Sequence, residues 1–243
     1  STNTWTEKAA FQTGREELAS AVIGGKIYVA GGAEYSGANS TLLDCYDPAA
    51  DAWESKAPMP VGLKRFTLSE AGGKLYAIGG DASVLCYDPA GNAWTAKTPM
   101  PTTRACHSAA VLNGKIYVTG GVFGNTSSLS SLQRVDCYDP EADVWTTRAP
   151  MAFGRYEHDS TVCDGKLYVF GGNSSLAGYA YPAEIECYDP GTNSWTTLSP
   201  MSTGRIGLCT EALNGKIYAV GGTSRGWSDI QANLDVYNPE VEP

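Results

Sequence analysis

The feature that most constrains the fold of this chain is a tryptophan followed, at a fixed distance, by two glycines. In each of five copies the tryptophan lies 26 residues before the first glycine. The five pairs are Trp5 and Gly31, Trp53 and Gly79, Trp94 and Gly120, Trp145 and Gly171, and Trp195 and Gly221. A spacing that stays constant over five copies indicates a repeated structural unit. We therefore expect one repeat architecture along all 243 residues.

Each unit has the pattern of a β-hairpin before its diglycine. In the first unit, residues 18–23 and 26–30 are expected to form strands joined by Gly24-Gly25. The dipeptides at this position in the other units are Gly72-Gly73, Asn113-Gly114, Asp164-Gly165 and Asn214-Gly215. These residues tolerate the positive φ angles of a two-residue hairpin turn, so an antiparallel pair is predicted in every unit.

A third and a fourth strand are expected after each diglycine. Following a variable loop, four units read Cys-Tyr-Asp-Pro, at 45–48, 86–89, 137–140 and 187–190, and the fifth reads Val-Tyr-Asn-Pro at 236–239. Proline cannot donate to a ladder, so it ends the third strand, and the fourth begins at the next tryptophan. Four antiparallel strands in roughly 50 residues are typical of a β-propeller blade.

The predicted fold class is an all-β, five-bladed propeller that forms a single domain over residues 1–243. The expected blades span approximately residues 14–58, 62–99, 103–150, 154–200, and 204–239 together with 3–9. The chain starts with a lone fourth strand around Trp5 and stops after a third strand. We therefore expect the N-terminal strand to pair in the C-terminal blade, which would close the ring without an open edge.

Composition argues against several classes of partner. The net charge is -9 and no block of Lys or Arg is present, which argues against nucleic acid. The longest apolar runs, such as 217–220, are strand-sized, so no membrane span is predicted. No charged-then-apolar leader opens the sequence, so a secretory signal is expected to be absent or to have been removed. The expected localisation is cytoplasmic, and the expected state is a monomer.

Seven cysteines are present, and four of them occupy one repeat position before a tyrosine: Cys45, Cys86, Cys137 and Cys187. Equivalent positions in packed sheets are about 10 Å apart, whereas a disulfide spans roughly 7 Å at most between Cα atoms. We expect free thiols, with these four buried as small hydrophobic residues, in a reducing compartment. Glycosylation sequons at Asn39, Asn125 and Asn173 point the other way, although loops rich in Asn and Ser generate such triplets readily.

The combined pattern resembles Kelch repeats: an arginine, Lys-Ile-Tyr-Val-x-Gly-Gly, Cys-Tyr-Asp-Pro, a tryptophan and Pro-Met-Pro. The Cys-Tyr-Asp-Pro form is most similar to the Kelch-like substrate adaptors, and the resemblance covers practically the whole chain. It implies a groove for a substrate peptide, lined by loops and arginines. Those adaptors usually have six blades, separate N-terminal assembly domains, and often a tyrosine after the diglycine. This sequence has five units, no such domains, and other residues after the diglycine, so a ubiquitin-ligase role would need parts that it lacks.

The repeat arginines are the first candidate binding residues. Four of them lie 16 residues before their diglycines: Arg15, Arg104, Arg155 and Arg205. The second unit has Leu63 at this position and Arg65 two residues later. One interpretation is a cationic cup at the channel mouth, suited to carboxylates or phosphates. The other is that each arginine braces its neighbouring blade, and that Glu16, Glu17, Glu157 and Asp159 neutralise part of the charge.

Aromatic residues in the loops after the diglycines are the second candidate set: Tyr35, Phe123, Tyr179, Tyr181 and Trp227. Exposed aromatics beside arginines are common anchors of binding surfaces, although each could also fold back over its own loop. The second loop is short, with seven residues from Gly80 to Tyr87 against 14, 17, 16 and 15 in the other units. This low wall, at 81–84, predicts a side entrance for an extended ligand.

The sequence offers little support for catalysis, and no metal or cofactor is expected. His107 and His158 follow their arginines by three residues and could form a metal or acid–base site with Cys106, Glu157 and Asp159. A zinc site needs three or four donors at about 2.0–2.3 Å, which strands of adjacent blades do not guarantee. Some Kelch-type propellers are copper oxidases or sugar mutarotases, but the tyrosine, cysteine and paired histidines of the oxidases have no match here.

The function expected is that of a non-enzymatic protein-interaction domain, which binds a short polar or acidic peptide at the loop-rich mouth of the propeller. Two alternatives remain open. One is a small-molecule or sugar-processing enzyme that uses the same cup. The other is a scaffold, natural or engineered, without a ligand.

Overall fold

A computed structural model describes residues 4–125, 128–175, 181–224 and 229–239 of the chain. All the named elements are β-strands, and the chain forms two compact units. Unit 1 comprises residues 1–79 and 83–97, and unit 2 comprises residues 80–82 and 98–243. The described residues contain no helix long and apolar enough to cross a membrane.

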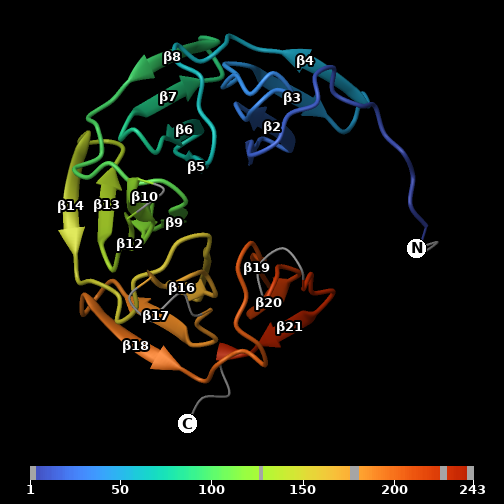
Figure 1. Cartoon of the computed structure of the whole chain (residues 1–243). Coiled ribbons are helices and arrows are strands. Elements are labelled where there is room, and N and C mark those ends of the chain that lie inside the picture. Colours follow the sequence, from blue (N-terminus) through green and yellow to red (C-terminus); the bar gives the residue numbers. More distant parts are fainter. Residues whose placement is uncertain (1–3, 126–127, 176–180, 225–228, 240–243) are drawn as a thin grey trace. The chain divides into compact units, whose positions relative to one another are not determined.

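Unit 1 contains two four-stranded antiparallel sheets, each with its strands in sequence order (Figure 1). The first sheet consists of β1 (Ala19–Ile23), β2 (Lys26–Ala30), β3 (Leu43–Asp47) and β4 (Ala52–Ser55). The second consists of β5 (Thr67–Ala71), β6 (Lys74–Ile78), β7 (Val84–Asp88) and β8 (Ala93–Ala96). Each sheet corresponds to one repeat of the sequence.

Unit 2 contains two further four-stranded sheets and one sheet of three strands. The third blade consists of β9 (Ser108–Leu112), β10 (Lys115–Thr119), β13 (Val135–Asp139) and β14 (Val144–Arg148). The fourth consists of β15 (Asp159–Cys163), β16 (Lys166–Phe170), β17 (Ile185–Asp189) and β18 (Ser194–Leu198). The fifth consists of β19 (Cys209–Leu213), β20 (Lys216–Val220) and β21 (Leu234–Tyr237). A separate hairpin of β11 (Val122–Asn125) and β12 (Ser128–Ser131) is inserted between β10 and β13.

Five sheets for five repeats confirm the predicted all-β, five-bladed propeller. The hairpin turns are also confirmed, because both residues of each turn have positive φ. At Asn113-Gly114, for example, the φ angles are 52° and 73°. Asparagine and glycine reach this region at little steric cost, which explains their recurrence at this position.

The expected N-terminal strand is not observed. Residues 4–10 have no strand assignment, the Trp5 side chain is fully exposed, and the described part of the fifth blade has three strands. An extended segment becomes a strand only when a partner accepts its backbone hydrogen bonds. Closure by residues 3–9 is therefore not confirmed and stays a prediction.

The other four repeat tryptophans tie each blade to the chain that enters it. The indole Nε1 of Trp145 donates to the carbonyl of Thr98 at 2.9 Å, and the ring packs on Tyr138 with centroids 5.0 Å apart. Asp143 accepts from the Thr98 N–H at 2.9 Å and from the Tyr138 hydroxyl at 2.6 Å. The same indole bond recurs from Trp53 to Ala9, from Trp94 to Ala57 and from Trp195 to Ala149. This contact accounts for the fixed place of tryptophan in the repeat.

Apolar side chains from consecutive sheets of one unit form the core. In unit 1, Tyr28 and Leu43 of the first blade cluster with Leu75 and Tyr87 of the second. Unit 2 has corresponding clusters between its third and fourth and between its fourth and fifth blades. The seven cysteines are free, as expected, and the four before the third-strand tyrosines are buried within the sheets.

Candidate functional site

The four repeat arginines are buried inside their own blades, with 0% of each side chain exposed. Each guanidinium pairs with the acidic residue that lies directly before the third-strand Cys-Tyr or Val-Tyr. The pairs are Arg15 and Asp44 at 2.5 Å, Arg104 and Asp136 at 2.8 Å, Arg155 and Glu186 at 2.7 Å, and Arg205 and Asp235 at 2.7 Å. Backbone carbonyls of the same blade accept further bonds from each guanidinium. The arginines thus connect the start of a blade to its second and third strands.

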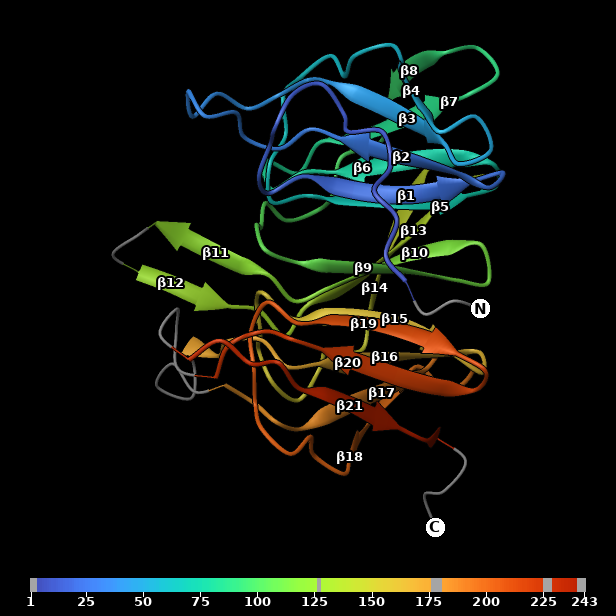
Figure 2. The ribbon, with the colours of Figure 1, turned by 90° about the vertical axis from the view of Figure 1, so that its right-hand side faces the viewer.

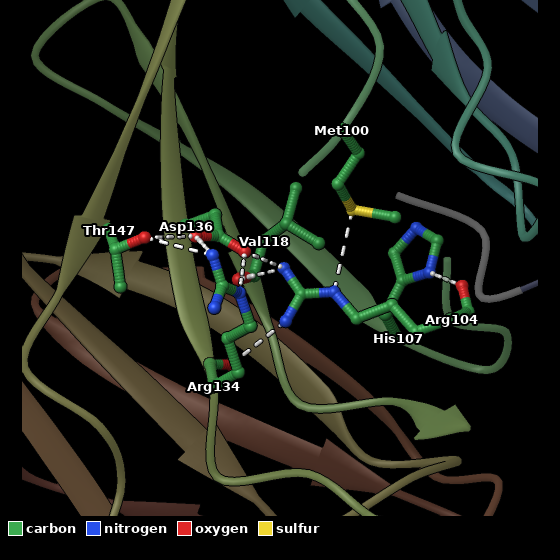
Figure 3. Close-up of polar contacts among 7 residues, drawn as sticks. All are labelled: Met100, Arg104, His107, Val118, Arg134, Asp136 and Thr147. Carbon is green, nitrogen blue, oxygen red and sulfur yellow. Dashed lines mark hydrogen bonds and ion pairs between the residues drawn. The ribbon is translucent and has the colours of Figure 1, made fainter. Parts of the chain in front are cut away.

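Arg104 illustrates the arrangement (Figure 3). Its Nη2 donates to Asp136 and to the carbonyl of Val118, its Nη1 donates to the carbonyl of Arg134, and its Nε faces the Met100 sulfur. Burial lowers the pKa of Arg104 to about 10, and the positive charge of Arg134 contributes to the lowering while Asp136 opposes it. The guanidinium therefore stays charged at neutral pH, and its charge is compensated within the blade.

The second blade replaces this ion pair by two leucines. Leu63 stands at the arginine position and Leu85 at the acidic position, and both are buried in one apolar cluster. Arg65 does not take over the missing role. It has a positive φ of 51°, its side chain is 56% exposed, and it pairs with Glu17 at 2.5 Å.

The predicted cup of five arginines is therefore wrong for Arg15, Arg104, Arg155 and Arg205. Each guanidinium is buried and forms an ion pair and at least one backbone-carbonyl contact inside its blade, so it does not face a ligand. The Nε atoms of Arg15, Arg155 and Arg205 are buried without a hydrogen-bond partner among the described residues. The bracing interpretation describes them better, with the correction that each side chain braces its own blade. The acidic partners were missed, although the sequence contained a signal. An acidic residue precedes Cys-Tyr or Val-Tyr only in the four units that have the arginine.

Within a blade, the loop after the diglycine lies beside the segment that carries the arginine. Short antiparallel bridges join them in four blades: Glu16 with Ala33, Ala105 with Val122, Tyr156 with Asn173, and Ile206 with Thr223. We call this end of a blade its loop face. The second blade has a short connection between β6 and β7; the low wall and the side entrance stay predictions.

Two of the predicted aromatic residues are exposed on the loop face. Tyr35 is fully exposed, and 57% of Phe123 is exposed. Phe123 lies in β11 and not in a loop as expected, because residues 122–125 and 128–131 of the long connection pair as antiparallel strands. This hairpin extends away from the sheet of the third blade (Figure 2). Tyr181 is half-buried, while Tyr179 and Trp227 lie outside the described residues.

Two shallow hollows open among these loops, one in each unit. The first has a volume of about 520 Å³ and is lined in part by Arg15, Glu16, Glu34 and Tyr35. The second has a volume of about 410 Å³ and is lined in part by Tyr181, Ser224, Asp229 and Gln231. Each hollow combines a tyrosine with at least one carboxylate.

The two histidines occupy a packing position. His158 is 6% exposed, its Nε2 lies 2.9 Å from the Thr119 hydroxyl, and its ring lies against Gly120. His107 is 7% exposed, and its Nδ1 lies 3.0 Å from the Arg104 carbonyl. The equivalent residues in the other three blades are apolar: Leu18, Phe66 and Leu208. The described residues contain no group of three or more His, Cys, Asp or Glu side chains that could hold a metal ion.

Asp159 holds the inner strands of three blades together. Its carboxylate accepts bonds from the Ser160 N–H at 2.9 Å, the Ser108 hydroxyl at 3.3 Å, and the Thr210 N–H and hydroxyl at 2.6 and 3.0 Å. These residues belong to β9, β15 and β19. Burial raises the pKa of Asp159, while the four donors oppose the shift.

Acidification should destabilise the fold through His158. Burial lowers the pKa of His158 well below its usual value, and Arg155, His107 and Arg104 lower it further. In the unfolded chain the imidazole of His158 takes up a proton near pH 6.5, whereas in the folded chain it stays neutral to a lower pH. The free energy of unfolding is therefore highest above pH 6.5 and decreases as the pH falls. The loss should approach about 1.4 kcal/mol per pH unit until the folded pKa is reached.

Urea unfolding from pH 7.5 down to about pH 5 would measure this loss. The control variant is His158→Leu, because leucine occupies the same position in the fifth blade. Below pH 6.5 the free energy of unfolding of this variant should depend much less on pH than that of the parent. Equal slopes for the two proteins would contradict the assignment.

Comparisons with known proteins agree with this architecture. The family model described as the KLHDC2/KLHL20/DRC7 Kelch-repeats domain matches residues 65–240, and the Kelch motif matches residues 14–60. Beta-scruin of Limulus polyphemus is 31% identical over 71% of this chain. Kelch-like protein 35 of Mus musculus and Kelch-like protein 26 of Danio rerio are 29% and 30% identical over 70% of it. The chain spans 15% of the length of beta-scruin and 21% of each Kelch-like protein.

The solved structure of YjhT superposes with a TM-score of 0.80 at 18% identity, over 97% of this chain and 88% of YjhT. At this identity the likeness concerns the fold. The family model covers well over half of the sequence, and its match continues the repeat pattern that the sheets display. The chain therefore belongs to the Kelch-repeat family.

Proposed function

We propose that this chain is a non-enzymatic protein-interaction domain that binds a short peptide on its loop face. Kelch propellers are typically interaction domains, which supports the general class. The observation that supports the location is the exposure of Tyr35 on the loop face of the first blade and of Phe123 on that of the third. Large aromatic side chains that stand free of their own fold are common anchors of protein interfaces.

The charge of the ligand needs revision. The acidic peptide expected from the sequence depended on five arginines, and four of these are paired inside their blades. Arg65 is exposed, but Glu17 compensates its charge. The proposal therefore keeps a peptide ligand and drops its acidic character.

The enzyme alternative depended on the same cup and on His107 and His158. Both histidines are buried at a packing position, and the arginines of the cup form structural pairs. No arrangement in the described residues favours a particular reaction, so the interaction domain remains the function proposed. A scaffold without a ligand is an outcome of the test below.

Selection from a random peptide library displayed on phage would test the proposal. Enriched peptides should bind the parent chain and lose at least about tenfold in affinity when Tyr35→Ser and Phe123→Ser are combined, because anchor residues contribute more than about 1 kcal/mol each. The control is Val144→Ser, an exposed apolar residue of β14 outside the loop face, which should leave binding unchanged. Failure to enrich any peptide, or binding that is insensitive to the double variant, would contradict the proposal and favour a bare scaffold.

A further inference from the structure

The hollow beside Tyr35 is lined by carboxylates and an aromatic ring, whereas the predicted arginine cup would have been cationic. It lies between the segment that leads into the first blade and the loop after its diglycine, and its volume is about 520 Å³. We call it the Tyr35 hollow and define it by Arg15, Glu16, Glu34, Tyr35 and Gly37. It lies wholly within unit 1.

Backbone hydrogen bonds fix the two segments that line this hollow. Glu16 and Ala33 exchange two backbone hydrogen bonds, at 3.0 and 2.7 Å, which places Glu16 beside the start of the loop. The Gly37 N–H donates to the Glu34 carbonyl at 2.7 Å and closes a turn, with Gly37 at a φ of 81°. Tyr35 is the second residue of this turn and has no part of its ring covered. The turn therefore presents a bare aromatic ring next to Glu34.

The accessible charge of the hollow is negative. The guanidinium of Arg15 is buried and bound to Asp44, and burial lowers its pKa while the charge of Asp44 and, to a smaller extent, that of Glu34 oppose the lowering. Arg15 therefore offsets part of the Glu34 charge and none of its side chain is exposed to a ligand. Neither Glu16 nor Glu34 forms an ion pair within the described residues. A hollow with two carboxylates and one exposed ring is complementary to a cation, because the face of an aromatic ring attracts positive charge.

We propose that the Tyr35 hollow binds a lysine or arginine side chain of a partner peptide. The carboxylates of Glu16 and Glu34 supply charge-assisted hydrogen bonds, and the ring of Tyr35 supplies a cation–π contact. The proposal rests on the proposed function, since it names the chemistry of the peptide that the loop face would take. The net charge of -9 favours the same class of partner, because an acidic protein attracts basic segments at long range.

The test uses glycine–serine peptides that carry one central residue, which is arginine, lysine, norleucine or glutamate. Each is titrated into the chain up to about millimolar concentration, the range of a weak single contact, and amide chemical shifts are recorded. The arginine and lysine peptides should shift the amides of residues 14–16 and 33–38, and the norleucine and glutamate peptides should not. Added salt should weaken the effect, because the pairs are partly exposed.

Three variants identify the contacts. Tyr35→Leu should weaken the arginine peptide about twofold to fivefold, and Glu16→Gln combined with Glu34→Gln by at least as much. Tyr35→Phe should retain binding, and Glu54→Gln should have no effect, since Glu54 is an exposed carboxylate of β4 already paired with Lys56. The inference is overturned if the glutamate peptide binds equally well, if the shifts occur elsewhere, or if no cationic peptide causes a shift.

The two proposals can fail separately. If phage-selected peptides bind through Tyr35 and Phe123 while the cationic peptides do not bind, the cation site is wrong and the interaction domain stands. If the cationic peptides bind at the Tyr35 hollow but selection yields no peptide sensitive to the Tyr35→Ser and Phe123→Ser pair, the cation site stands and the proposed role of Tyr35 and Phe123 as anchors of a longer peptide is wrong.

Discussion

Replacement of Arg155 by leucine is expected to lower the free energy of unfolding by about 3–5 kcal/mol. The reason is the charge that is left behind. Glu186 is 0% exposed, and without Arg155 its carboxylate would be buried without a counter-charge. Glu186→Leu should cost a similar amount for the converse reason, since the desolvated guanidinium would lose its carboxylate. Equilibrium unfolding in urea measures each value.

The double variant Arg155→Leu with Glu186→Leu should recover most of that loss. The second blade already has leucines at both positions, Leu63 and Leu85, and buries them in one apolar cluster. Replacing a buried ion pair by well-packed apolar residues is often neutral or stabilising. Arg65→Leu is the control and should cost less than about 1 kcal/mol, because its pair with Glu17 is exposed. If the double variant loses as much free energy of unfolding as the two single variants together, a leucine pair cannot replace the ion pair in this blade.

The fold could be predicted from the sequence because its determinants are local and repeated. The turn dipeptides, the prolines that end the third strands and the constant tryptophan spacing each restrict the backbone within one unit. The observed strand bounds agree closely with the predicted ones. The second strand of the first unit, for example, was expected at 26–30 and is Lys26–Ala30. The β11–β12 pair was missed because its sequence, Val-Phe-Gly-Asn and Ser-Leu-Ser-Ser, has little of the alternation between apolar and polar residues that marks a strand.

The site could not be predicted in the same way, because burial of a charged side chain depends on a partner distant in sequence. When one unit is considered alone, nothing near the arginine in the sequence indicates that it is buried. Its acidic partner lies 32 residues later for Arg104 and 31 residues later for Arg155. A comparison of the arginine position with the position before Cys-Tyr or Val-Tyr across the five units would have indicated the pairing. The unit that lacks the arginine, at Leu63, also lacks the acidic residue, at Leu85. The exposure of Tyr35 depends on a turn at Gly37 that is specific to its own loop.

The diglycine has a physical cause that the repeat spacing alone does not reveal. Gly171 has a φ of 64°, and a Cβ added there would lie 2.3 Å from the Arg205 carbonyl oxygen and 2.6 Å from a methyl group of Leu208. Its neighbour Gly172 donates its N–H to the same carbonyl at 2.8 Å. The backbone of the fourth blade thus passes so close to the fifth that no side chain fits between them. Gly31 and Gly120 are crowded by Leu63 and Arg155 in the same manner.

Gly171→Ala should therefore destabilise the chain by about 2–5 kcal/mol. Roughly 1–2 kcal/mol comes from placing a Cβ in the left-handed region, and roughly 1–3 kcal/mol from forcing apart two packed backbones. Gly165→Ala separates the two causes, because Gly165 has a φ of 72° but nothing lies within 4 Å of its added Cβ. It should show the conformational cost alone. Equal losses for the two variants in urea unfolding would mean that the left-handed backbone, and not the close approach of neighbouring blades, explains the diglycine.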